Sequence, residues 1–113
     1  MVRVTMAAAG ASFSAVIGNF SASTDESTAR LIVPAACTAR NLRANFTGTV
    51  ASRTITLRVN EGATSLSCSV TSGSPTCTNS GSTVNLSTGD FINYEVTGGN
   101  QAGLSGYVSA VCE

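Results

Sequence analysis

Four cysteines carry the site chemistry that is most readily assigned from this sequence. They are Cys37, Cys68, Cys77 and Cys112, and four cysteines allow three disulfide pairings. Cys68 and Cys77 flank a Ser-Gly-Ser-Pro segment typical of a turn, so a bond between them would staple one hairpin and leave Cys37 to join Cys112. Zinc sites use closer cysteine pairs, and the chain has no histidine. We therefore expect two disulfides and an oxidising final environment, in preference to a metal site or free thiols.

The residue types on which many enzymes depend are absent. Without histidine, Ser-His-Asp and Cys-His catalytic arrangements are excluded. Without lysine, Schiff-base chemistry and a P-loop are excluded. Asp25 and Glu26 lie in a polar segment that suits a cation, but a solvated loop is the simpler interpretation. We predict a protein that is not an enzyme and that holds no cofactor and no metal.

The overall charge excludes two further classes of protein. The chain has 113 residues, which suits one domain, with six basic and six acidic residues and a formal net charge of zero. A nucleic-acid-binding protein normally has a basic excess. No apolar run approaches the ~20 residues that a membrane span needs, and the short apolar segment near Met6 does not predict a cleaved export signal. We expect no nucleic-acid partner and no membrane.

Four polar or amphipathic residues are candidates for a subunit interface. Arg43 and Arg58 lie on the polar faces of their predicted strands, and Glu95 lies on the polar face of its own. These charges would form pairs across strands or between subunits. Tyr107 lies on the parity opposite Leu104, which suits a surface, a three-fold interface or a binding face. The alternative is solvated surface charge, contributing under ~1 kcal/mol.

Alternation of apolar and polar residues predicts the elements that position these side chains. Segments with this period of two are separated by short stretches rich in Gly, Ser, Asn and Asp, which is typical of about eight short strands in antiparallel sheets with one wet face. The residues predicted to point inward are Leu42, Ala44, Phe46, Ile55, Leu57, Val59, Leu66, Cys68, Val70, Val84, Leu86, Ile92, Tyr94, Val96, Leu104, Val108, Ala110 and Cys112.

The first part of the chain has a different pattern. Residues 1–27 are predicted to be an N-terminal arm, and residues 13–20 within it suit a strand that is about equally apolar on both faces. A strand is expected over residues 28–33, ended by Pro34. The remaining domain is expected to span residues 28–113.

Four segments of this domain have a distinctive sequence, and they are VPAACTARNL at residues 33–42, the paired ITLRVNEG and SLSCSV at residues 55–70, TCT with TVNLSTGDF at residues 76–91, and VSAVC at residues 108–112. In these segments the domain resembles the C1q/TNF-like jelly-roll modules of bacterial and phage structural proteins. This resemblance implies an all-β, antiparallel β-sandwich of jelly-roll type. Because the first and last strands of a jelly roll are neighbours, the resemblance suits a bond between Cys37 and Cys112.

The resemblance also implies a function. Such modules occur as trimers in capsid decoration proteins, in tail and fibre tips, and in the heads of collagen-like spore-surface proteins. This chain has no collagen repeat and no long shaft. We expect a homotrimeric capsid decoration (cement) protein that binds the major capsid protein, is made in the host cytoplasm and lies on the capsid surface of the virion. The alternatives are a tail or fibre module that binds a receptor or carbohydrate, and a secreted bacterial surface structural protein.

Overall fold

The computed structural model describes residues 2–5, 12–14, 18–21, 30–46, 52–71, 73–98 and 105–113. These residues form eleven β-strands and, within those ranges, no helix. The strands are β1 (Val2–Thr5), β2 (Ser12–Ser14), β3 (Gly18–Ser21), β4 (Leu31–Ile32), β5 (Cys37–Phe46), β6 (Arg53–Val59), β7 (Gly62–Val70), β8 (Thr76–Asn79), β9 (Val84–Leu86), β10 (Phe91–Gly98) and β11 (Ser105–Cys112).

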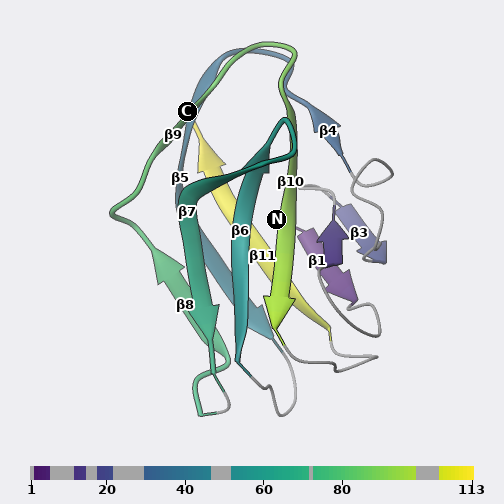
Figure 1. Cartoon of the computed structure of the whole chain (residues 1–113), viewed down its shortest axis with the longest axis vertical. Helices are drawn as coiled ribbons and strands as arrows, with labels where there is room; N and C mark the ends of the chain where they lie inside the picture. The colour runs from purple at the N-terminus through teal and green to yellow at the C-terminus, as the bar shows by residue number, and fades with distance from the viewer. Residues whose placement is uncertain are drawn as a thin grey trace.

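Two sheets face each other across one core (Figure 1). Sheet A has the strand order β3-β1-β11-β5-β8, and β9 pairs with the first residues of β5. Sheet B has the order β2-β10-β6-β7, and β4 pairs with the first residues of β10. The pairing of β1 with β3 is parallel, and the other strand pairs are antiparallel. The prediction of an all-β, antiparallel sandwich is therefore confirmed.

The N-terminal part of the chain contributes strands to both sheets. The prediction of one strand over residues 13–20 is wrong, because β2 pairs with β10 in sheet B whereas β3 pairs with β1 in sheet A. Of the strand predicted over residues 28–33, the structure shows β4, and residues 28 and 29 lie outside the described residues. The strands β1, β2 and β3 all come from the segment predicted to be an arm.

The core is built from the inward side chains of both sheets. The period of two predicts it well, because successive side chains of a strand point to opposite faces. The predicted inward residues that are buried are Leu42, Ala44, Phe46, Ile55, Leu57, Leu66, Val70, Leu86, Ile92, Tyr94, Val96 and Val108. Four others, Val59, Cys68, Val84 and Ala110, are partly buried.

The end of β11 departs from the predicted parity. Ala110 is partly buried but Cys112 is exposed, because the register against β5 shifts between Ser109 and Val111, as at a β-bulge. Leu104, predicted to share their face, lies outside the described residues.

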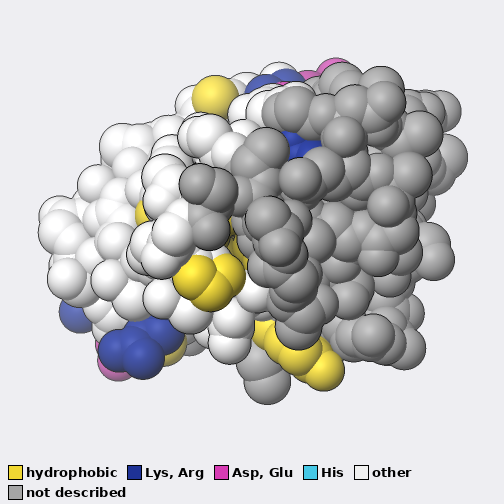
Figure 2. All heavy atoms as spheres, turned by 90° about the horizontal axis from the view of Figure 1, so that it is seen from below, with side chains coloured by type: hydrophobic (Ala, Val, Ile, Leu, Met, Phe, Trp, Pro, Cys, Tyr) yellow, Lys and Arg dark blue, Asp and Glu magenta, His cyan; other side chains and the backbone are white. Residues whose placement is uncertain are grey.

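The outward side chains are mostly uncharged. Two pairs of hydroxyl groups form hydrogen bonds between β6 and β7 on the outer face of sheet B. Thr54 Oγ1 lies 3.0 Å from Ser69 Oγ, and Thr56 Oγ1 lies 3.0 Å from Ser67 Oγ. At the end of the molecule seen in Figure 2, isolated basic and hydrophobic side chains lie in a described surface that is otherwise mainly uncharged.

Both predicted disulfides are present. Cys37 and Cys112, with Cα atoms 5.6 Å apart, join β5 to β11, which are neighbours in sheet A. Backbone hydrogen bonds between Thr38 and Glu113 lie beside this bond, with N···O distances of 2.7 and 3.1 Å. The disulfide and these hydrogen bonds thus fix β11, the last strand, to the beginning of β5.

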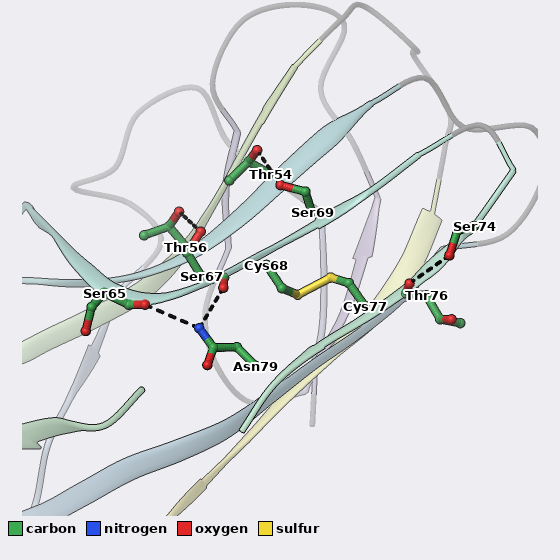
Figure 3. The surroundings of a disulfide bond; sticks show 10 residues. All are labelled: Thr54, Thr56, Ser65, Ser67, Cys68, Ser69, Ser74, Thr76, Cys77 and Asn79. Carbon is green, nitrogen blue, oxygen red and sulfur yellow. Dashed lines mark hydrogen bonds between the residues drawn. A yellow bond between two sulfur atoms is a disulfide. The ribbon is translucent and has the colours of Figure 1, made fainter. Parts of the chain in front are cut away.

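The second disulfide has a different structural role from the predicted hairpin staple. Cys68 lies on β7 of sheet B and Cys77 on β8 of sheet A, with Cα atoms 5.8 Å apart (Figure 3). The two strands are consecutive in sequence, but the chain crosses between sheets after β7. The bond therefore joins the two sheets at one edge of the sandwich.

The side chain of Asn79, on β8 of sheet A, also joins the two sheets at this edge. Its Nδ2 donates to the backbone oxygen of Ser67 at 2.8 Å and to that of Ser65 at 3.4 Å, both on β7 (Figure 3). Its Oδ1 accepts the backbone N–H groups of Gly81 and Ser82 at 3.1 and 3.0 Å. One amide thus satisfies carbonyls of an edge strand and shapes the turn after β8.

Candidate binding surfaces

The four predicted interface residues separate into two pairs on opposite faces of the sandwich. Arg43 on β5 and Tyr107 on β11 point outward from sheet A, because their strand neighbours in sequence are buried. Arg58 on β6 and Glu95 on β10 point outward from sheet B. Arg58 Nη1 lies 3.7 Å from Glu95 Oε1, and their side chains are only 17% and 20% exposed. Arg58 and Glu95 are therefore paired across strands within one subunit.

Six outward side chains from three adjacent strands form two rows on sheet A. The strand register places Ser109, Arg43 and Thr78 side by side, and it places Tyr107, Asn45 and Thr76 side by side in the next row. These residues line a shallow depression of about 570 Å³. We call the six residues Arg43, Asn45, Thr76, Thr78, Tyr107 and Ser109 the sheet A grid.

The sheet A grid presents hydrogen-bonding groups and one cation. Arg43 carries five N–H donors in a planar fork. The amide of Asn45 and the hydroxyl groups of the two threonines and the serine both donate and accept hydrogen bonds. Tyr107 is 43% exposed and adds an aromatic ring with a polar end. The residues that line the depression include no carboxylate.

Arg43 differs from Arg30, Arg40 and Arg58 in its electrostatic environment. Within the part of the chain that the structure describes, no carboxylate lies within 4.0 Å of its guanidinium. None of the described carboxylates therefore competes with an external group for this charge. The ion pairs present among the described residues are Arg30–Glu61 at 3.7 Å, Arg40–Glu113 at 3.5 Å and Arg58–Glu95 at 3.7 Å.

A second depression continues the first along β5. It has a volume of about 350 Å³ and is lined by Asn41 and Ser80 as well as by Arg43, Thr78 and Ser109, which it shares with the first. Asn41 adopts a positive φ of 56°, a conformation that Asn tolerates better than most residues. Arg43 thus borders two adjacent hollows on the outer face of sheet A.

A separate, mainly apolar pocket opens between the sheets near the Cys37–Cys112 bond. Its volume is about 620 Å³, and small side chains such as Ala35, Ala36 and Ala110 line it. Tyr94 also lines it, and burial raises the pKa of the Tyr94 hydroxyl well above its ordinary value. Among the other residues that line this pocket, Glu113 is the one with an ionisable side chain.

Sequence reasoning identified Arg43 and Tyr107 but missed the rest of the sheet A grid. The alternation from Leu42 to Phe46 predicts that Asn45 points outward. It does not predict which strands lie beside β5, because alternation gives the face on which a side chain lies and not the place of its strand in the sheet.

Other predicted sites do not enter the described structure. Asp25 and Glu26 lie outside the described residues. Among the residues that are described, no group of three or more His, Cys, Asp or Glu side chains is placed to hold a metal ion. The same part of the chain contains no helix with the length and apolar character needed to cross a membrane.

Comparisons of this chain with protein-family models, with curated protein sequences and with solved structures found no match.

Proposed function

We propose that this protein is a non-enzymatic structural protein of a virion, a decoration protein that binds the major capsid protein on the surface of a phage head. The observation that carries the proposal is a small two-sheet sandwich that is cross-linked by two disulfides, one within sheet A and one between the sheets. A protein that reinforces a lattice needs a stiff body with broad outward faces. The sequence resemblance of residues 28–113 to jelly-roll virion modules supports the same function.

The proposal predicts that the protein is abundant in mature particles. Quantitative mass spectrometry of purified virions should find it in a fixed ratio to the major capsid protein, and its removal should lower the temperature at which heads release DNA. A few copies confined to the tail would contradict the decoration function and favour a fibre module. Its absence from particles, with presence at a bacterial surface, would contradict a virion function altogether.

Self-association as a homotrimer belongs to the same proposal. Ile32 and Phe91 lie opposite each other on β4 and β10, and they are 58% and 38% exposed. The guanidinium of Arg30 lies 4.6 Å from the centroid of the Phe91 ring. This exposed apolar pair, with a cation beside it, is the subunit contact that we propose.

Light scattering tests this contact directly. The wild-type protein should be a trimer at micromolar concentration, and Ile32→Asp should be a monomer because a charge would enter an apolar contact. Val111→Asp is the matched control, because Val111 is also exposed, at 44%, but lies on β11 of sheet A. A monomeric wild-type protein would contradict the trimer, and a trimeric Ile32→Asp variant would contradict the contact.

A second candidate function, carbohydrate binding, is favoured by one observation. The sheet A grid combines an exposed tyrosine ring with an amide and several hydroxyl groups on a flat strand surface. This combination of an aromatic platform and mixed hydrogen-bonding groups suits the apolar face and the hydroxyl groups of a sugar.

A further inference from the structure

We propose that the sheet A grid binds an acidic saccharide and that Arg43 binds the carboxylate of one of its uronic acid units. This inference rests on the second candidate function, carbohydrate binding, and it does not require the protein to be part of a virion.

The charge requirement comes from Arg43. Its side chain is exposed, and among the described residues no carboxylate is near enough to neutralise it. A guanidinium binds a carboxylate through two parallel N–H···O bonds, which fixes the orientation of the ligand as well as attracting it. The carboxylate of a uronic acid has the planar shape that this fork requires.

The neighbours of Arg43 favour a saccharide over an acidic protein segment. Ser109 and Thr78 flank it in the same row, and Asn45 lies next to it on β5. These groups donate and accept hydrogen bonds, as sugar hydroxyl groups also do. An acidic peptide would call for several cations, whereas the sheet A grid provides one.

Tyr107 supplies the apolar part of the site. It is 43% exposed and lies opposite Asn45 in the register of β11 with β5. Its ring presents a flat apolar face with a polar hydroxyl at the edge, and the C–H groups of a sugar ring pack on such a face.

The extent of the surface suggests a ligand longer than one sugar. Adjacent strands lie about 4.8 Å apart, so a row of three side chains spans roughly 10 Å. The two depressions of about 570 and 350 Å³ share Arg43, so the cation lies partway along the site and not at its end. We therefore expect an oligosaccharide whose uronate is flanked by further sugar units.

Calorimetry with three defined ligands tests the inference. The probes are a tetramer of galacturonic acid, its neutral methyl ester and an oligoglutamate peptide of the same charge. The wild-type protein should bind the acidic tetramer and lose about 10- to 100-fold in affinity for the ester, since hydrogen bonds to a charged group are the strong ones. Arg43→Gln should lose a similar factor for the acidic tetramer, and Arg43→Lys should be intermediate.

Variants on the surface keep the test independent of folding. Arg58→Gln removes the same charge from the outer face of sheet B, where Arg58 is paired with Glu95, and it should bind the tetramer like the wild type. Tyr107→Ala should weaken binding of tetramer and ester alike, whereas Tyr107→Phe should keep most of it. Thermal unfolding should show that the two variants at Arg43 and the two variants at Tyr107 fold as the wild type does.

The outcomes separate this inference from the function on which it rests. Equal binding of the tetramer and its ester would overturn the acidic specificity and leave carbohydrate binding in place. Stronger, Arg43-dependent binding of oligoglutamate would overturn the saccharide in favour of an acidic protein partner. Binding of neither saccharide would overturn the acidic specificity and the second candidate function together.

Discussion

Replacing Cys37 and Cys112 together with alanine should lower the free energy of unfolding by about 4.5 kcal/mol, which is the chain-entropy value for a loop of this length. The two cysteines are 75 residues apart in sequence, so their bond removes much of the freedom of the unfolded chain. Cys112 is exposed and Cys37 is partly buried, so the substitutions themselves leave little empty core. Urea unfolding of the oxidised proteins, followed by far-ultraviolet circular dichroism, measures the difference.

The paired variant Cys68→Ala with Cys77→Ala is the comparison. Its cysteines are only 9 residues apart. The same chain-entropy relation gives about 2.7 kcal/mol for this shorter loop. If loop length governs both bonds, the Cys37–Cys112 variant will be the less stable of the two. The reverse order would show that joining the two sheets at their edge matters more than the length of the loop.

Replacing Asn79 with alanine should lower the free energy of unfolding by about 2–3 kcal/mol, because groups left without a partner carry a desolvation cost. The substitution removes the donor that faces the backbone oxygens of Ser65 and Ser67 and the acceptor that faces the N–H groups of Gly81 and Ser82. The Cys68–Cys77 bond remains in this variant, so the measurement isolates the contribution of the amide. Urea unfolding measures the change.

Two further variants give this prediction its controls. Asn85→Ala removes an exposed amide whose oxygen lies 3.1 Å from the Thr38 hydroxyl, and it should cost less than about 1 kcal/mol. Asn79→Asp keeps the shape and the acceptor but replaces the donor with a negative charge facing carbonyl oxygens. It should be at least as destabilising as Asn79→Ala at neutral pH. A stable Asn79→Asp variant would contradict the role assigned to the Nδ2 donor.

The sequence predicted the inward faces of the strands because side-chain direction in a strand depends on local geometry alone. Leu42, Ala44 and Phe46 are buried as their spacing required, and the same reasoning placed Arg43 on the outside. Where a bulge shifts the register of β11, the parity no longer predicts exposure, and Cys112 lies outside the core.

Other features depended on contacts that sequence spacing does not encode. Arg53 shares the inward parity of Ile55 and is only 3% exposed. Gly98 lies opposite it on β10 with a φ of 139°, and a Cβ there would be 2.3 Å from the backbone oxygen of Ser52 and 3.0 Å from the Arg53 side chain. The glycine leaves room for this backbone and for the arginine, which no pattern along the chain indicated.

The pairing of the cysteines was predicted from the sequence, whereas the structural role of one of the two bonds was not. Their pairing was predicted from the turn residues between Cys68 and Cys77, which left Cys37 to join Cys112, and from the resemblance to jelly rolls, whose first and last strands are neighbours. The role of Cys68–Cys77 was not predicted, because a turn between two strands is compatible with a hairpin in one sheet and with a crossing between two sheets. The structure places β7 and β8 in different sheets, so the bond closes the edge of the sandwich.

The sequence by itself determined the all-β class, the scarcity of catalytic residue types, the inward parity of most strands and the four cysteines available for bonding. Only the tertiary structure decided which outward residues meet. Arg43 and Tyr107 face one side on adjacent strands, whereas Arg58 and Glu95 pair on the other. The physical reason is that alternation is set by the backbone of each strand, whereas strand order is set by long-range pairing and packing of the whole chain.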